Sequence, residues 1–285
     1  MVSQKSTVAF LKVIVYNVMD IIWKGLVWYM AEIKKTKAVI MENELLCDGI
    51  YSIWLKEESI AKVAKPGQFL SIYCKEGSRL LPRPISICEI DDEKTMLRIV
   101  FRVAGAGTNE IAEAKKMDEI EIMGPLGNGF FLENTSNSIL IGGGIGIPPM
   151  LELAKNLPGK KQIVLGYRSE TFLVDEFKLY GEVIIATEDG SIGTKGNVID
   201  AMREHGITDG MIFACGPTPM LRGVKSFASE HNLVAQLSME ERMACGIGAC
   251  LACVCKSKDK DHHSNVNNKR VCKDGPVFYA DEIEL

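Results

Sequence analysis

The chain has 285 residues, of which 47% are hydrophobic and 25% charged, and its formal net charge is −4. These are the proportions of a soluble globular protein; the length allows about two domains, and the slightly negative charge argues against a nucleic-acid partner. Nine cysteines, four of them in a spaced cluster, argue for a reducing compartment rather than a disulfide framework. We therefore expect a cytoplasmic protein.

Residues 1–29 differ in character from the rest of the chain. Residues 8–30 are mostly apolar, but four polar side chains interrupt them, namely Lys12, Asn17, Asp20 and Lys24. A membrane span needs about 20 apolar residues with few charges, and a signal peptide needs an early basic region and a small-residue cleavage site. No membrane span is therefore expected. We expect Met30 to be the natural start and residues 1–29 to be an extension of doubtful origin; a membrane-surface or partner-binding helix is the alternative.

Residues 31–132 contain short β-like runs separated by turn residues. The runs are residues 33–41, 50–56, 68–74, 85–90, 97–103 and 119–123. Short strands at regular spacing predict an antiparallel β-barrel. One helix, residues 108–116, interrupts them, and Thr108 is its predicted N-cap.

From residue 133 to about 240 strands and helices alternate. The predicted strands are residues 138–141, 162–167, 182–187, 211–214 and 233–238, and the predicted helices are 148–156, 197–205 and 218–231. This alternation predicts an open parallel α/β sheet covered by helices. Residues 241–285 then form a small cysteine-containing domain. Its polar stretch, residues 256–270, is expected to be a solvated hairpin or loop, with His262 and His263 exposed.

A glycine-rich loop follows the first strand of the predicted sheet. It contains Gly142, Gly143, Gly144 and Gly146, and a helix begins immediately after it. Glycines at such a strand-to-helix turn let a dinucleotide pyrophosphate approach the backbone, and the helix N-terminus favours negative charge. A later strand ends in Cys215, Gly216 and Pro217. Since ligands bind at the carboxyl ends of strands in such sheets, these residues are expected to line the same crevice; simple burial of Cys215 in the core is the alternative.

Two segments of the barrel carry residues suited to a phosphate. One strand opens with Arg83, Pro84, Ile85 and Ser86, and the predicted helix is preceded by Gly105 and Gly107. An arginine can contact a phosphate through two hydrogen bonds, and a helix start offers free N–H groups. Each feature alone is more often a surface ion pair or a plain cap, but the two together indicate a phosphate-binding site.

The cysteines Cys245, Cys250, Cys253 and Cys272 follow the spacing C-x4-C-x2-C with 18 residues before the fourth. Plant-type [2Fe–2S] ferredoxins use this spacing. Small residues between the cysteines let the backbone wrap a cluster and direct N–H groups at its sulfurs. A structural zinc site and a chance cluster of buried cysteines are the alternatives. Cys255 is expected to alternate away from the cluster on a short strand and is not assigned as a ligand.

Together these motifs resemble the ferredoxin reductase superfamily. More narrowly, residues 124–130 (GPLGNGF), 240–245 (EERMAC) and 271–278 (VCKDGPVF) resemble the electron-transfer subunits of NAD-dependent dihydroorotate dehydrogenase. The resemblance covers residues 31–285 and not residues 1–29. Many members of the superfamily carry a flavin-stacking aromatic residue where Ile85 stands, so that role does not carry over.

The resemblance implies three domains and an electron path. FAD would lie on the barrel of residues 31–132, with Arg83 on its pyrophosphate, Ser86 near the isoalloxazine and Thr108 at a phosphate. NAD would bind residues 133–240, with Cys215 as the catalytic residue near its reactive carbon. The [2Fe–2S] domain, residues 241–285, would face an FMN-containing subunit that oxidises dihydroorotate to orotate in pyrimidine biosynthesis, in a heterotetramer with two of each chain. Electrons would pass from FMN through the cluster and FAD to NAD+.

Two other functions remain open. The first is a small subunit of an NAD(P)H:ferredoxin or sulfur oxidoreductase; in one branch of these an aspartate replaces the first cluster cysteine, and Cys245 argues against that branch. The second is a non-enzymatic relay or regulatory subunit, against which the intact glycine loop and the Arg83/Ser86 pair argue. The sequence leaves NAD and NADP undecided, since residues 167–169 (Tyr-Arg-Ser) could meet a 2′-phosphate.

Overall fold

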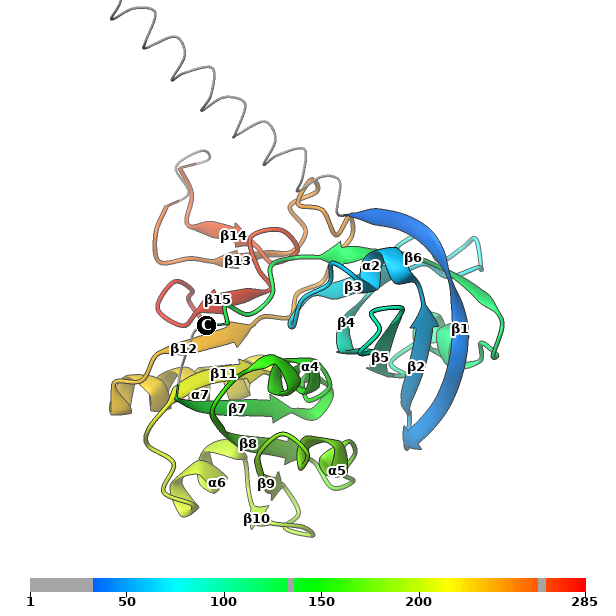
Figure 1. The fold of residues 1–285 in the computed structure, drawn as a ribbon. Helices are drawn as coiled ribbons and strands as arrows, with labels where there is room; N and C mark the ends of the chain where they lie inside the picture. The colour runs from blue at the N-terminus through cyan, green and yellow to red at the C-terminus, as the bar shows by residue number, and fades with distance from the viewer. Residues whose placement is uncertain (1–32, 133–135, 261–264) are drawn as a thin grey trace, which may run out of the picture.

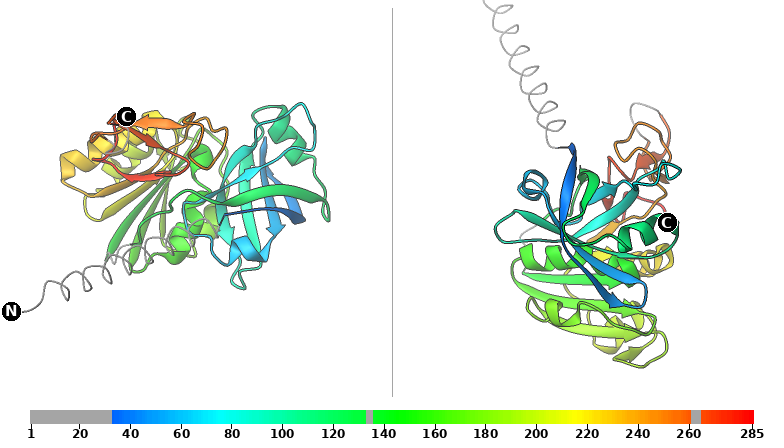
Figure 2. Two further views of the ribbon diagram at one scale, coloured as in Figure 1. Left: turned by 90° about the horizontal axis from the view of Figure 1, so that it is seen from above. Right: turned by 90° about the vertical axis from the view of Figure 1, so that its right-hand side faces the viewer.

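The computed structural model describes residues 33–132, 136–260 and 265–285. They form a β-barrel, a helix-covered sheet beside it, and a C-terminal segment that packs on both (Figures 1 and 2). Residues 1–29, and with them the predicted extension, lie outside the described residues, as do His262 and His263. In the part of the chain that is described, no helix is long and apolar enough to cross a membrane.

The barrel is closed and antiparallel, with strand order β1-β2-β5-β4-β3-β6. Its strands are β1 (Lys34–Cys47), β2 (Ile50–Lys56), β3 (Phe69–Ile72), β4 (Arg83–Ile90), β5 (Met96–Arg102) and β6 (Glu119–Leu126). Apolar side chains such as those of Ile53 and Leu55 alternate inward and fill the interior, as the period of two in a strand requires. The predicted barrel is confirmed, although β1 continues beyond residue 41 through two irregularities in its register.

Two short helices accompany the barrel, α2 (Glu58–Ala61) and α3 (Ala106–Ala112). Helix α2 was not predicted. The prediction of Thr108 as an N-cap is wrong, because α3 begins at Ala106 with Gly105 as its N-cap. Thr108 instead occupies the third helical position, where its hydroxyl accepts hydrogen bonds from the N–H groups of Ala104 (2.8 Å) and Gly105 (3.1 Å).

The sheet has the order β10-β9-β8-β7-β11-β12-β15, and all its pairings are parallel except β12 with β15. Its strands are β7 (Asn137–Gly143), β8 (Lys160–Tyr167), β9 (Glu182–Thr187), β10 (Thr194–Lys195), β11 (Met211–Cys215), β12 (Ala235–Ser238) and β15 (Val277–Tyr279). Ile139 and Ile141 pack with helices α6 (Val198–Glu204) and α7 (Thr218–His231). Leu140 packs on the other face with α4 (Pro149–Asn156) and α5 (Val174–Phe177). Helices thus cover both faces, which explains the near-continuous apolar strands and confirms the predicted α/β sheet.

The C-terminal segment leaves the sheet after β12 and returns to it in β15 (Figure 1). In between, β13 (Val254–Lys256) pairs antiparallel with β14 (Asn268–Arg270). The two ends of the polar stretch, residues 256–270, are therefore held together as the paired strands of a hairpin. The return of β15 to the edge of the sheet was not predicted, because three residues carry too little periodicity to be recognised as a strand.

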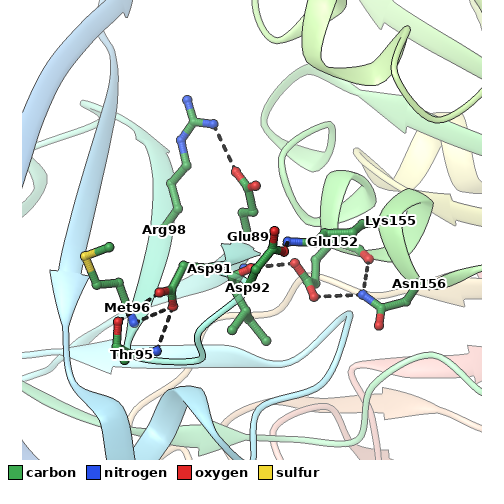
Figure 3. Close-up of polar contacts among 10 residues, drawn as sticks. Glu89, Asp91, Asp92, Thr95, Met96, Arg98, Glu152, Lys155 and Asn156 are labelled. Atoms are coloured by element: carbon green, nitrogen blue, oxygen red, sulfur yellow. Dashed lines mark hydrogen bonds and ion pairs between the residues drawn. The ribbon is translucent and has the colours of Figure 1, made fainter.

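Polar contacts fix the barrel against helix α4, and Figure 3 shows them. The N–H of Ile90 donates to Glu152 Oε2 (2.8 Å), and Lys155 Nζ donates to the carbonyl of Ile90 (3.1 Å). Lys155 also pairs with Asp92 (2.5 Å), and Asn156 donates to Glu152 Oε1 (2.7 Å). Burial raises the pKa of the Glu152 carboxyl, although these hydrogen bonds and the charge of Lys155 oppose the shift. A buried carboxylate therefore lies at the junction of the two domains.

Arg98 of β5 forms the second polar link between the domains. Its guanidinium contacts Glu89 of the barrel (3.3 Å) and makes a two-pronged ion pair with Glu176 of α5. Only 7% of Arg98 is exposed, so this pair is far less screened by solvent than a surface salt bridge. Together with the contacts of α4 it holds the sheet in one orientation relative to the barrel.

Candidate functional site

A cavity of about 370 Å³ lies where the barrel, the sheet and the start of the C-terminal segment meet. The barrel contributes Arg83, Pro84, Ile85, Ser86 and Thr108, and the sheet contributes Ile145 and Cys215. The structure thus brings the predicted flavin segment and the predicted nicotinamide segment to one place. The C-terminal segment adds residues that sequence reasoning did not select, namely Met239, Glu240, Glu241, Met243 and Pro276. A signal was available for residues 239–243, since they follow β12 at the carboxyl end of a strand of the same sheet, whereas Pro276 directly precedes β15.

Arg83 and the first turn of α3 are in direct contact. The Arg83 guanidinium lies so close to Gly107 that a Cβ on this glycine would overlap it. Arg83 also donates to the carbonyl of Leu81. The two segments that were predicted to share a phosphate therefore lie side by side. Ile85 is buried and its aliphatic side chain lines the cavity, at the position where many superfamily members have an aromatic ring.

The glycine loop is built by close packing of the chain on itself. A Cβ on Gly146 would overlap the carbonyl of Cys215, one on Gly142 would come within 2.9 Å of Ile147 Cα, and one on Gly143 would overlap Met220. Gly144 differs, because its φ of +53° favours glycine and open space surrounds its missing Cβ. Gly144 is therefore the glycine of this loop whose surroundings leave room for a ligand. The loop forms a short 3₁₀ turn, η1 (Gly144–Gly146), before α4 begins.

Cys215 lies at the end of β11, in contact with the glycine loop, and lines the cavity. Burial, and to a lesser extent the charge of Glu240, raise the pKa of its thiol to about 12, although a hydrogen bond with Ser238 opposes the shift. The thiol therefore stays protonated at neutral pH. Cys215 can present a neutral, polarisable wall to a ligand in the cavity, but the site does not activate it as a thiolate nucleophile.

The cluster cysteines lie on a loop whose backbone N–H groups point at sulfur. The N–H of Gly248 donates to Cys272 Sγ (3.1 Å), that of Ala249 to Cys245 Sγ (3.3 Å) and that of Cys272 to Cys253 Sγ (3.4 Å). Gly246, Gly248 and Leu251 adopt positive φ values, which turn the backbone around the sulfurs. Such N–H···S contacts stabilise thiolates, the form in which cysteine binds iron.

The four thiols are arranged as two pairs. Burial would raise the pKa of Cys245, but N–H groups of its loop and the thiol of Cys250 lower it to about 6. Burial raises the pKa of Cys272 to about 12, and the neighbouring Cys253 adds to the shift. Across the described ranges, no three His, Cys, Asp or Glu side chains converge on a site for one metal ion. Two pairs fit a two-iron cluster, which distributes four thiolates over two irons.

Cys255 lies on the short strand β13, as predicted, and it is buried whereas its neighbours Val254 and Lys256 are exposed. Its direction relative to the iron–sulfur cluster stays a prediction. Burial raises the pKa of Cys255 to about 11, and its charged neighbours are Glu241 and Lys269. None of the N–H···S contacts among the cluster cysteines involves Cys255 in the described residues, so it remains outside the proposed ligand set.

The family model of the iron–sulfur cluster binding domain of dihydroorotate dehydrogenase B matches residues 240–284. A relative from Caldanaerobacter subterraneus is 41% identical over 87% of this chain and 98% of its own length. One from Fusobacterium nucleatum is 42% identical over 86% and 97%. Both carry the name dihydroorotate dehydrogenase B (NAD(+)), electron transfer subunit. The chain belongs to this family.

Solved structures agree with this family of electron transfer subunits. A structure from work on flavin-based electron bifurcation by NADH-dependent reduced ferredoxin-NADP oxidoreductase is 30% identical, covers 87% of this chain and 89% of its own, and has a TM-score of 0.78. The ferredoxin reductase of carbazole 1,9a-dioxygenase is 20% identical, covers 70% of this chain and 65% of its own with a TM-score of 0.57, and shows the shared fold alone. The resemblance read from the motifs is confirmed, as is the fold class of barrel, α/β sheet and C-terminal iron–sulfur domain.

Proposed function

We propose that this chain carries electrons from the FMN of a dihydroorotate-oxidising partner subunit, through a [2Fe–2S] cluster and FAD, to NAD+. The observation that carries the proposal is the shared cavity. Arg83 and Ser86 of the barrel, Cys215 of the sheet and Met243, two residues before Cys245, all line it. The names of the relatives support the same function. A flavin in this place would exchange two electrons with a nicotinamide and one electron at a time with a cluster.

The residues of this chain would bind and orient the cofactors. Arg83, held beside Gly107, would contact the FAD pyrophosphate, and Thr108, whose hydroxyl accepts from Ala104 and Gly105, would hold the start of α3 in place beside the same phosphate. Ser86 would lie near the isoalloxazine. Gly144 has the open space that a nicotinamide dinucleotide needs above the loop, and protonated Cys215 would pack beside its reactive ring. We propose the domains accordingly as residues 31–132 for FAD, 133–240 for NAD and 241–285 for the cluster.

The cluster face would dock the partner. Ile247 is 48% exposed and Leu251 61% exposed, and both lie in the cysteine loop beside the exposed Cys250. Apolar side chains clustered on a surface indicate an interaction site, and a single electron must enter the cluster through the face that is closest to its donor, the FMN of the partner. We propose a cytoplasmic complex with two copies of each subunit.

An NAD(P)H:ferredoxin oxidoreductase subunit is the second candidate, because one solved relative of that kind shares 30% of its residues with this chain. The dihydroorotate dehydrogenase B relatives share 41% and 42%. Co-purification separates the two functions. A subunit that co-purifies with an FMN protein and reduces NAD+ with dihydroorotate supports our proposal, whereas coupling to ferredoxin without dihydroorotate activity supports the second candidate.

A cluster-free variant tests the electron path. Cys253→Ser in the full complex should abolish the cluster spectrum but retain FAD and the reduction of a two-electron dye by NADH, because hydride exchange needs only flavin and nicotinamide in contact. The same complex should no longer couple dihydroorotate oxidation to NAD+ reduction. Coupling at the normal rate without a cluster would show that electrons reach FAD directly and that the proposed order is wrong.

A further inference from the structure

The segment after β6, residues 127–131, is anchored to both large domains. Gln68 of the barrel donates from Nε2 to the carbonyl of Gly127 (2.7 Å). Gln236 of β12, which is fully buried, exchanges two hydrogen bonds of 2.9 Å each with the backbone N–H and carbonyl of Phe131. Because both ends of the segment are held, the residue between them, Asn128, has a fixed position relative to the barrel and the sheet.

Asn128 reaches from this segment to the loop that follows Cys272. Its Nδ2 donates to the carbonyls of Lys273 (3.0 Å) and Asp274 (3.2 Å), and its backbone N–H donates to the carbonyl of Gly275 (2.6 Å). Since both side-chain partners are carbonyl oxygens, which only accept, the amide must present its NH₂ group to them. Asn128 therefore binds all three carbonyls of residues 273–275.

The opposite side of the same loop is bound by Arg270. The N–H groups of Lys273, Asp274 and Gly275 all donate to the carbonyl of Arg270, at 3.1, 2.7 and 3.3 Å. Thus every backbone donor of the three residues goes to Arg270 and every backbone acceptor receives a bond from Asn128. Backbone polar groups need such partners when they leave water, and this loop finds all of them in two residues.

The Arg270 side chain extends the contact to the cysteine loop. Its Nε and Nη2 donate to the two carboxylate oxygens of Asp274, both at 2.9 Å, and its Nη1 lies 3.4 Å from the carbonyl of Gly248. The N–H of Gly248 in turn donates to Cys272 Sγ. Arg270 therefore connects the loop after Cys272 with the backbone that contacts the sulfur of Cys272.

The contact between the two segments is too close for larger residues. Gly127 has a φ of +73°, and a Cβ on it would lie 2.6 Å from Pro276 Cδ and 2.8 Å from the carbonyl of Gly275. A glycine at this position meets both the backbone requirement and the steric one. The close approach of residues 127–128 to residues 275–276 is thus built into the sequence GPLGNGF.

We propose that Asn128 and Arg270 are positioning residues that clamp the loop after Cys272 and so fix the fourth thiolate of the cluster relative to the flavin barrel. This inference rests on the proposed assignment of Cys272 as a ligand. Residues that orient a metal ligand through hydrogen bonds act strongly on metal retention although they touch no metal. Since one-electron transfer slows steeply with distance, the same clamp would keep the separation of cluster and flavin constant.

Asn128→Asp in the full, cofactor-loaded chain tests the clamp. The substitution keeps the shape of the side chain but places a carboxylate against two carbonyl oxygens. We expect iron to be lost to an added chelator about tenfold to hundredfold faster, with an altered electron paramagnetic resonance spectrum of the reduced cluster. Asn267→Asp is the matched control, because Asn267 makes a similar amide-to-carbonyl bond (3.1 Å to Lys258) away from Cys272 in the same domain. It should leave both measurements unchanged.

Arg270→Lys tests the other side of the clamp. Lysine keeps the charge but cannot make the planar two-pronged contact with Asp274, so iron loss should again accelerate. Bound FAD per chain, measured on each variant, distinguishes a folded chain with a weakened cluster from a misfolded one. If Asn128→Asp does not accumulate as folded chain, Asn128→Ala removes the amide donors without adding a charge and is judged by the same iron-loss rate.

Cys272→Ser separates failure of the clamp from failure of the ligand assignment. If this variant keeps the [2Fe–2S] spectrum, Cys272 is not a ligand and the underlying proposal is wrong. If it loses the spectrum while the Asn128 and Arg270 variants keep wild-type iron loss and resonance spectra, the ligand assignment stands and the clamp is refuted. Faster iron loss in both clamp variants, with Asn267→Asp unchanged, supports the inference.

Discussion

Arg83→Ala should weaken FAD binding strongly. The guanidinium of Arg83 is held beside the turn at Gly107 and faces the cavity, where we place the pyrophosphate. Losing a charge-assisted phosphate contact costs about 1.5–3 kcal/mol, which corresponds to an increase in the FAD dissociation constant of roughly tenfold to hundredfold. The variant should lose flavin on dilution, and both the NADH–dye activity and the coupled activity with it.

Gly107→Ala should imitate this loss without removing the arginine. A Cβ at Gly107 would lie much less than 3.0 Å from three atoms of Arg83, namely Nε, Cζ and Nη2. Real Cβ atoms essentially never approach another atom so closely. The guanidinium would have to leave its place. Gly105→Ala should weaken binding less, because a Cβ there meets nothing within 4 Å and its φ of 176° is ordinary extended backbone.

Titration of the flavin-free chain with FAD, followed by flavin fluorescence at low and high salt, measures these effects. The difference between wild type and Arg83→Ala should shrink at high salt, because ions screen a partly exposed charge pair. Arg203→Ala, which removes a surface ion pair in the sheet domain, is the control for loss of a positive charge. Wild-type FAD affinity in Arg83→Ala would refute the phosphate contact. Equal losses in Gly105→Ala and Gly107→Ala would show that displacement of Arg83 is not the cause.

Three further predictions concern the cluster, the first residues of the chain and the domain junction. Iron and acid-labile sulfide should each approach about two per chain, and serine in place of Cys245 or Cys250, but not of Cys255, should abolish the cluster spectrum; zinc without sulfide would contradict this. A chain beginning at Met30 should bind FAD and its partner like the full chain, which pull-down and flavin content test. Burial raises the pKa of Glu152 above its ordinary 4.5, so its contribution to stability is full below that value and is lost as pH rises through the raised pKa. The free energy of unfolding, measured with urea, should therefore rise for Glu152→Gln relative to wild type as the pH increases from about 5 to about 8. Parallel pH profiles of the two proteins would contradict this prediction.

Periodicity and motif spacing predicted the parts of this protein whose signal is local. The period of two in the barrel strands, the alternation of strands and helices after residue 133 and the spacing from Cys245 to Cys253 each lie within one continuous stretch, so each could be read directly. That the Arg83 strand and the Gly107 turn lie close together could be inferred as well, since both motifs were assigned to one phosphate.

Contacts between distant backbone atoms could not be predicted. Asn128 binds carbonyls that belong to residues 273–275, and a carbonyl carries no residue-specific signal in a sequence. Threonine is a residue type that favours N-cap positions, but Thr108 is the third residue of α3. Its hydroxyl accepts hydrogen bonds there because the chain before the helix turns back on it.

The topology of the C-terminal segment itself brings the cluster close to the cavity. Strand β12 ends at Ser238 and β15 begins at Val277, and these two residues face each other in the antiparallel pair. The N–H of Met239 also donates to the carbonyl of Pro276 (2.8 Å). The cysteine loop is therefore an excursion whose two ends are joined at the carboxyl end of β12.

This closure sets an upper limit on the distance between the cluster and the flavin cavity. Pro276 lines the cavity and Cys272 precedes it by four residues, so their Cα atoms are at most about 14 Å apart even in a fully extended chain. The loop is turned rather than extended, and Arg270 and Asn128 hold it in that form, so the true separation is shorter. Lengthening this loop should slow transfer between flavin and cluster while leaving hydride exchange intact. The short spacing between Cys272 and Pro276 therefore keeps the cluster close enough to the flavin cavity for electron transfer.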